Sequence, residues 1–468
     1  MKKLILIYSV CFFALGISVS CKKELNALPT QSKVEGNAII DQKSAEVALN
    51  GVYLRFAEGG DDRGTPSIMW SGNHEITPTY LAGYITYPYG GSSLDENNLI
   101  TATDYSVAGL WSTYYSVLNA ANGVIEQVSK LQDQQFSGSR KLEIIAEARL
   151  LRAYGHQALL RYFSQFYDLN SSYGVMLRKE FVTTNNISQK RSSVKESYDF
   201  ILADLDDAIA HGPAVSVNYY TNKWVAKALK ARVLMIRGAA GDYAQVVALT
   251  DDIIRNSPYL LEPQLHDLFS SKGLESKEVM LGLFPKVNQV SKSDTYFYRE
   301  SPGYLATPSF KALFATDPRN SWMIGVVGTT PDGILKYKGP KVEVSYALRL
   351  TEVYLLEAEG IVRSGGDLNA AKALLKTVLE HAGVVDFTAL NNANTPDALL
   401  IQIYNETAKN LSFEDGQDWS ALLRMPIAFV LGVKPAITDK NHFILPIPKE
   451  EFDKNPAIGD QNPGYSKN

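Results

Sequence analysis

The sequence predicts a mainly α-helical protein built on tetratricopeptide-like helix pairs, with long irregular loops and a few short strands. The first observation is that apolar residues recur at helical spacing over most of the 468 residues. The second is that glycine and small residues mark the turns of two helix pairs. The third is that glycine, proline and aromatic residues interrupt the helical pattern in two long stretches, residues 59–91 and 257–340.

The N-terminus has the organisation of a lipoprotein signal peptide over residues 1–20. Two lysines precede an apolar run at 4–19, which is short for a membrane-spanning helix. Ser20 and Cys21 follow, so Cys21 is the predicted site of lipidation and of attachment to a membrane. Ser18 stands where such signals usually carry an aliphatic residue, and a plain secretory signal cut nearby is the alternative.

Helical periodicity predicts the elements of the mature chain in order. The predicted helices cover residues 43–56, 108–131, 141–167, 195–210, 223–237, 243–255, 346–364, 369–382, 395–411 and 418–423. The stretch 59–91 is predicted as a long irregular excursion, and 257–340 as irregular with a strand-like run at 279–284. Prolines make the segment 444–448 extended.

Two of these helix pairs resemble tetratricopeptide units. Gly241 frees the backbone between the helices 223–237 and 243–255, and Pro258 closes the second helix. Gly366 takes the same place before the helix 369–382, where Ala371 and Ala373 allow close packing. Such pairs form a scaffold with grooves. Any antiparallel helical hairpin gives the same pattern and stays open as the alternative.

Composition and charge argue against several classes of protein. The formal net charge is −4, and no run of Lys or Arg is longer than two, so a nucleic-acid partner is not expected. Cys11 and Cys21 are the only cysteines, which rules out a disulfide framework and a cysteine-based zinc site.

Motifs of catalysis are missing from the sequence. The six histidines form no H-E-x-x-H pattern, and there is no G-x-S-x-G, Walker A loop or G-x-G-x-x-G. We therefore expect no metal, no cofactor and no enzyme activity. Ser192 and Ser193 are predicted to cap the helix 195–210, and the acidic run 204–207 to form a solvated helix face.

Aromatic residues in the irregular stretches are the strongest sign of a binding site. Tyrosine occurs 26 times, and it offers a flat apolar face together with a hydroxyl group. Such faces suit sugar rings, while Asn73 and similar side chains suit their hydroxyls. The predicted ligand-binding residues are Trp70, Asn73, Tyr80, Tyr84, Tyr87, Tyr89, Tyr296 and Trp322. The alternative for each ring is packing onto the helices, and Trp111, Trp224 and Trp419 are expected in the core.

Short segments in a fixed order resemble the SusD/RagB family of outer-membrane nutrient-uptake lipoproteins. These segments are residues 48–53, 111–122, 147–154, 173–175, 307–319, 349–359 and 446–465. One segment departs from the family pattern: Glu406, Leu411, Phe413 and Glu414 remain between 406 and 424, but several charged members are replaced and Asp415 looks inserted. Those charges form a structural network in the family, so the departure implies local repacking around Trp419.

The resemblance implies a lipoprotein on the outer membrane, anchored through Cys21 and facing the cell surface. Such a protein would bind a nutrient, usually a glycan, and deliver it to a SusC-like TonB-dependent transporter without covalent chemistry. Its regions would be residues 21–220 and 221–468, joined as one intertwined unit. A helical-repeat envelope scaffold without a small ligand, a peptide-binding variant and a hydrolase are the alternatives.

Overall fold

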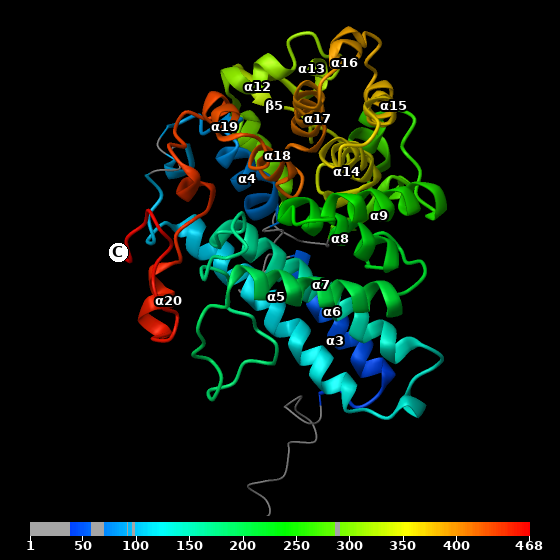
Figure 1. The fold of residues 1–468 in the computed structure, drawn as a ribbon, viewed down its shortest axis with the longest axis vertical. Helices are drawn as coiled ribbons and strands as arrows, with labels where there is room; N and C mark the ends of the chain where they lie inside the picture. Colours follow the sequence, from blue (N-terminus) through cyan, green and yellow to red (C-terminus); the bar gives the residue numbers. More distant parts are fainter. Residues whose placement is uncertain (1–37, 58–69, 91, 96–98, 286–290) are drawn as a thin grey trace, which may run out of the picture.

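The computed structural model describes residues 38–57, 70–90, 92–95, 99–285 and 291–468. The chain is mainly helical, which confirms the predicted fold class (Figure 1). The predicted signal peptide and the lipidation site Cys21 lie outside the described residues, so the structure does not bear on them.

Long helices form the body of the molecule. Within the described residues these are α3 (Gln42–Ala57), α5 (Tyr105–Ser129), α6 (Arg140–Phe163), α7 (Val194–His211), α8 (Lys223–Arg237), α9 (Asp242–Asn256), α14 (Leu350–Arg363), α15 (Leu368–His381) and α17 (Pro396–Leu411). From α5 to α9, each helix packs against the next along the chain, and α9 packs against α14. Helix α14 also packs against α15 and α17, so the helices form one stack (Figure 1).

The two predicted tetratricopeptide-like pairs are α8–α9 and α14–α15. Gly238 directly follows α8 and Gly241 directly precedes α9, both with a positive φ (59° and 85°) that glycine adopts without strain. Asp367 caps the N-terminus of α15, since its side chain accepts the Asn369 N–H. Ser193 caps α7 as predicted, because its hydroxyl accepts the Glu196 N–H while the Glu196 carboxylate accepts the Ser193 N–H.

Short elements fill the irregular stretches. The helices are η1 (Ser71–Ile76), α4 (Thr77–Leu81), η2 (Ser93–Asp95), η4 (Asp133–Gln135), α10 (Leu265–Asp267), η5 (Leu268–Lys272), η6 (Gly273–Glu275), α11 (Lys292–Phe297), η7 (Tyr298–Glu300), α12 (Pro308–Leu313), α13 (Asn320–Met323), α16 (Thr388–Asn392), α18 (Gln417–Leu422), α19 (Ile427–Val433), η8 (Lys440–Phe443) and α20 (Lys449–Lys454). The strands are β1 (Ile85–Thr86), β2 (Val279–Leu283), β3 (Leu305–Ala306), β4 (Ile324–Val327), β5 (Thr330–Ile334) and β6 (Ser345–Arg349). They form an antiparallel sheet in the order β1-β3-β5-β4 and an antiparallel pair β2-β6.

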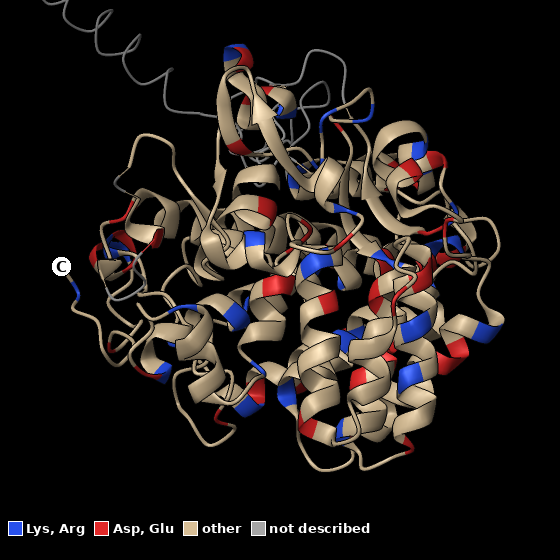
Figure 2. Cartoon of the chain, turned by 90° about the horizontal axis from the view of Figure 1, so that it is seen from above, with Lys and Arg blue, Asp and Glu red and all other residues tan. Residues whose placement is uncertain are grey.

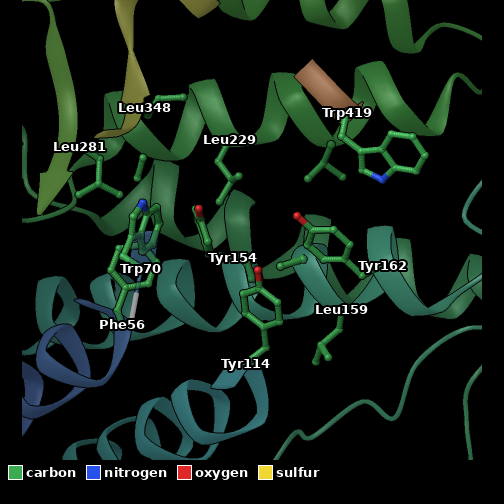
Figure 3. Close-up of a cluster of buried hydrophobic side chains, with 14 of the residues drawn as sticks. Phe56, Trp70, Tyr114, Tyr154, Leu159, Tyr162, Leu229, Leu281, Leu348 and Trp419 are labelled. Atoms are coloured by element: carbon green, nitrogen blue, oxygen red, sulfur yellow. The ribbon is translucent and has the colours of Figure 1, made fainter. Parts of the chain in front are cut away.

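One hydrophobic core extends through both halves of the chain. It runs from Ile39, just before α3, to Ile458 after α20. Figure 3 shows aromatic and aliphatic side chains from distant segments meeting in this core. A smaller core lies between α14, α15 and α17. Trp111, Trp224 and Trp419 are buried, as predicted.

Three predictions about local structure are wrong. Residues 71–81 are helical (η1 and α4) and buried, where an irregular excursion was expected. The helix predicted at 346–364 begins only at Leu350, because 345–349 form the buried strand β6 against β2. A fully buried run fits a strand or a helix equally well from the sequence alone. The helix predicted at 141–167 ends at Phe163.

Basic residues (blue) and acidic residues (red) alternate along the ribbon over most of the molecule in the view of Figure 2. In the part of the chain that the structure describes, no helix is both long and apolar enough to cross a membrane.

Candidate ligand-binding site

The two aromatic segments singled out in the sequence lie side by side in the structure. Strand β1 pairs with β3, with Ile85 opposite Ala306. The Thr307 N–H donates to the Tyr84 carbonyl (3.0 Å), and the Thr307 hydroxyl donates to the Gly83 carbonyl (2.8 Å). The loop after β1 is therefore fixed beside the segment that follows α11.

A row of tyrosines crosses this junction. Tyr80 and Tyr304 meet edge to face with ring centroids 5.7 Å apart, and Tyr87 and Tyr89 do so at 5.4 Å. Burial raises the pKa of Tyr304 to about 12, with a smaller contribution from Tyr87, so this hydroxyl stays protonated. Tyr87 and Tyr89 are 42% and 76% exposed, and they form the open end of the row.

A tight turn holds the two exposed rings together. The Gly90 N–H donates to the Tyr87 carbonyl (3.0 Å), and Gly90 has a φ of 76°, which glycine adopts without strain. An exposed pair of aromatic rings on a fixed loop costs little conformational entropy when a ligand covers it.

Lys434, which follows α19, fixes the base of the same loop. Its ammonium group is buried and donates to the Tyr80 carbonyl (2.7 Å) and the Leu94 carbonyl (2.8 Å). These two carbonyls bracket the chain that carries Tyr87 and Tyr89. Burial lowers the pKa of Lys434 to about 7, although the nearby charge of Asp95 works in the opposite direction.

The lowered pKa of Lys434 predicts a pH dependence of stability. In the unfolded chain the pKa returns to about 10.4. Between about pH 7 and pH 10 the unfolded chain therefore binds more protons at this residue, so its contribution to the free energy of unfolding increases with pH. We expect denaturant titrations of Lys434→Met to show a smaller rise in stability over this range than those of the native chain. Equal slopes in the two proteins would contradict the assignment.

Most of the predicted binding residues are buried instead of exposed. Trp70 stacks on His74 with ring centroids 3.6 Å apart and planes 1° apart. The Asn73 amide donates to the Thr113 hydroxyl (3.1 Å), and the Tyr84 hydroxyl is hydrogen-bonded to that of Tyr404. The predicted residues whose side chains pack inside the protein are Trp70, Asn73, Tyr80, Tyr84 and Tyr296.

The burial of these five residues corrects the assignment of ligand contacts to them. They lie on or against helices, so their side chains are packed inside the protein and offer no open face to a ligand. Tyr87 and Tyr89 keep exposed faces. Trp322 lies in α13, away from the tyrosine row, where it is half-buried and stacks on His266 of α10 with ring centroids 4.8 Å apart.

A group of buried polar side chains packs next to the tyrosine row. The Lys292 ammonium donates to Glu75 Oε1 (2.8 Å), and the Tyr296 hydroxyl donates to Glu75 Oε2 (2.8 Å). The same ammonium lies 3.3 Å from the centroid of the Tyr337 ring. Burial lowers the pKa of Lys292, and the Glu75 carboxylate opposes that effect. All four side chains are fully buried, so their role is to fix the position of Tyr296 and its neighbours.

Buried arginines organise the charges around the altered segment. Arg232 lies between Glu352 and Asp415, Arg349 between Glu278 and Glu414, and Arg319 between Asp317 and Glu406. Asp204, expected on a solvated face, is likewise buried and accepts two hydrogen bonds from Arg152 (2.8 and 2.7 Å). A buried carboxylate without a cationic partner would lower the stability of the fold. Which cation pairs with each carboxylate cannot be predicted from the sequence.

The apparent insertion at Asp415 has a structural role. Its φ is 44°, in a turn that includes Gly416 with a φ of 65°, and its carboxylate meets Arg232 and His74 inside the core. Burial alone would raise the pKa of Asp415, but Arg232, His74 and Arg161 together outweigh this effect and lower the pKa. Burial lowers the pKa of His74, which keeps its imidazole neutral.

A metal ion would need several ligating side chains close together. Across the described ranges, no three His, Cys, Asp or Glu side chains come together as ligands for a metal ion.

Comparison with known families gives a match in the first half of the chain. Residues 73–235 match a SusD-like family that is described as starch-binding and associating with the outer membrane. A SusD-like protein of Bacteroides ovatus is 27% identical over 192 residues, which cover 39% of this chain and 34% of that protein. The SusD-like protein P38 of Formosa agariphila is 27% identical over 241 residues, covering 47% and 44% of the two chains. The match thus spans less than half the length of these curated relatives.

Solved structures match over nearly the whole chain. A SusD superfamily protein from Bacteroides thetaiotaomicron has a TM-score of 0.73 at 21% identity, covering 91% of this chain and 100% of its own. A laminarin-binding SusD-like protein has a TM-score of 0.68 at 20% identity, with the same coverage. At these identities the similarity establishes the fold.

Proposed function

Because the chain belongs to the SusD/RagB family, we propose that it binds a glycan at the exposed pair Tyr87 and Tyr89. The family model that matches residues 73–235 covers the helices that carry this loop, and its description names starch binding. A relative in fold is called laminarin-binding. These descriptions support a polysaccharide ligand in preference to a peptide.

The observation that carries the proposal is the exposure of two aromatic rings on a loop that is fixed from three sides. The β1–β3 pairing, the Gly90 turn and the Lys434 ammonium each restrain the loop. Exposed aromatic rings outside the core favour a binding role. Tyrosine supplies the apolar face that stacks on the C–H groups of a sugar and a hydroxyl that bonds to its oxygens.

We further propose that the protein acts by binding and release, without covalent chemistry. Buried Glu352, Glu406 and Glu414 are each paired with an arginine, and Glu278 also with His381, which gives these carboxylates a structural role. Delivery to a SusC-like TonB-dependent transporter and anchoring to the outer membrane through Cys21 complete the proposal. Both rest on the family and on the family description of outer-membrane association.

Calorimetry with a panel of ligands tests this proposal. The panel contains oligosaccharides from starch and laminarin, acidic oligosaccharides, and mixed peptides. We expect the mature protein to bind at least one glycan, and the single variants Tyr87→Ala and Tyr89→Ala each to weaken binding roughly tenfold to hundredfold. That range follows from about 1.5–3 kcal/mol for covering one aromatic ring.

The matched control is Tyr105→Ala, since Tyr105 is a 78% exposed tyrosine on α5 outside the tyrosine row. This control should bind like the native chain. Binding of peptides alone would favour the peptide-binding variant, and binding of nothing by a folded protein would favour the scaffold.

A further inference from the structure

A second set of aromatic rings lies on other elements, at one end of the pair β2-β6. Tyr53 from α3 meets Tyr220 with ring centroids 4.8 Å apart, Tyr220 meets Tyr219 at 4.9 Å, and Tyr219 meets Phe284 at 5.1 Å. These four rings form an aromatic strip, which begins at buried Tyr53 and ends at Phe284, whose side chain is 57% exposed. It shares no residue with the tyrosine row that carries Tyr87 and Tyr89.

A cavity of about 270 Å³ opens along this strip. Asn50, Phe56 and the four rings line it, together with three aliphatic residues and Gly282. None of these described lining residues is charged. A pocket with apolar walls and a few polar groups suits a small neutral ligand, and the uncharged lining among the described residues disfavours an ionic one.

Hydrogen bonds fix the buried end of the strip, at Tyr53. The Tyr53 hydroxyl donates to Glu147 Oε2 (2.7 Å) and accepts the Thr221 N–H (2.9 Å). Arg140 Nη1 in turn donates a hydrogen bond to Glu147 Oε1 (2.7 Å). These bonds fix Tyr53, against which Tyr220 rests, so the inner half of the strip is preorganised.

The outer half is tied to strand β2. The Gly282 N–H donates to the Asn218 carbonyl (2.7 Å), and the Asn218 amide donates to the Leu274 carbonyl (2.7 Å). A Cβ at Gly282 would lie 2.4 Å from the end of the Leu274 side chain, which would have to move to make room for it. The contact brings Tyr219 from the α7–α8 connection onto Phe284 at the end of β2.

Two polar groups at the strip remain available to a ligand. The Tyr220 hydroxyl donates to Asn50 Oδ1 (3.0 Å), which orients the Asn50 amide. The Asn50 amide nitrogen and the Tyr219 hydroxyl make no hydrogen bond with any residue that the structure describes. Aromatic faces with uncharged donors beside them match the alternating C–H faces and hydroxyls of a sugar.

We propose that this pocket is a second binding site, and that it takes a neutral sugar unit. The test is calorimetry of the mature protein with maltohexaose and laminarihexaose as neutral probes and trigalacturonic acid as the acidic probe. Four proteins are compared: the native chain, Phe284→Ala, Tyr219→Phe, and the double variant of Tyr87 and Tyr89. Tyr105→Ala serves again as the matched control.

We expect a neutral probe to show a binding component that Phe284→Ala weakens about tenfold or more. Tyr219→Phe keeps the ring and removes only the hydroxyl, so it should weaken the same component less. The component should persist in the double variant of Tyr87 and Tyr89, and trigalacturonic acid should not produce it. Circular dichroism of each variant confirms that the fold is intact.

Three results would overturn this inference. If Phe284→Ala leaves the titration of both neutral probes unchanged while the double variant loses binding, the second site is rejected and the proposed function stands. A component that only trigalacturonic acid produces rejects a neutral ligand. No binding of either neutral probe by the native chain also rejects the second site, whereas the proposed function is judged on the wider panel.

A component lost in Phe284→Ala alone supports the second site and argues against Tyr87 and Tyr89.

Discussion

Replacing Arg232 by methionine is expected to lower the free energy of unfolding by about 3–5 kcal/mol, because it leaves buried carboxylates without a cation. Arg232 is 1% exposed and donates to both oxygens of Glu352 at 2.7 Å, to Asp415, and to the Ala347 carbonyl at 2.9 Å. These bonds connect α8 with α14, with strand β6 and with the turn before α18. Denaturant unfolding followed by circular dichroism measures the change.

The matched control for Arg232 is Arg255→Met. Arg255 pairs with Asp251 one helical turn away, and its side chain is largely exposed. Solvent screens such pairs, and the replacement should leave stability nearly unchanged. A similar loss in both variants would mean that the buried network is no more important than a surface pair. No loss in Arg232→Met would show that Glu352 and Asp415 find other partners or become protonated.

Replacing Trp70 by alanine is expected to cost about 3–5 kcal/mol of stability, the usual range for removing a buried tryptophan. Trp70 is fully buried, stacks on His74 and meets Phe56 edge to face at 4.9 Å (Figure 3). The indole Nε1 has no hydrogen-bond partner among the described residues, so Trp70→Phe loses no hydrogen bond and should cost less. Thermal denaturation of the two variants measures the difference. Equal stability of Trp70→Ala and the native chain would contradict the burial of this ring.

The helical framework could be predicted because its signal is local. Apolar residues at helical spacing predicted α3, α5, α8, α9, α15 and α17 to within a few residues. The tetratricopeptide-like turns could be predicted because Gly241 and Gly366, and the small residues near them, are local features of the sequence. Strand β6 was missed because all five of its residues are buried, and a short buried run carries no period of its own.

The position of the candidate site could be predicted only in part. The sequence singled out both aromatic segments, but their pairing through β1 and β3 depends on contacts more than 200 residues apart in the chain. Trp70 and Tyr84 were assigned to a ligand because residues 59–91 lack helical periodicity. Residues 71–81 are nevertheless helical, since contacts with distant segments such as Thr113 and Asp418 stabilise them.

The partners of buried charges could not be predicted at all. Asp204 stands in an acidic run that is typical of a solvated helix face, yet Arg152 from α6 pairs with it. Lys434 carries no signal in the sequence, because its importance for the loop of Tyr87 lies in two backbone carbonyls far away in the chain. The aromatic strip that ends at Phe284 was missed for the same reason, since Tyr53, Tyr219 and Phe284 meet only in the folded chain.

The central claim is that the exposed pair Tyr87 and Tyr89, and not the buried aromatic residues beside it, binds the glycan. The most direct test is calorimetric titration of Tyr87→Ala and Trp70→Phe with the same glycan that the native chain binds. We expect Tyr87→Ala to lose affinity roughly tenfold to hundredfold while its thermal stability stays near that of the native chain. Trp70→Phe should lose stability and keep its affinity. A Trp70→Phe variant that is folded but binds weakly, beside a Tyr87→Ala variant with native affinity, would contradict the claim.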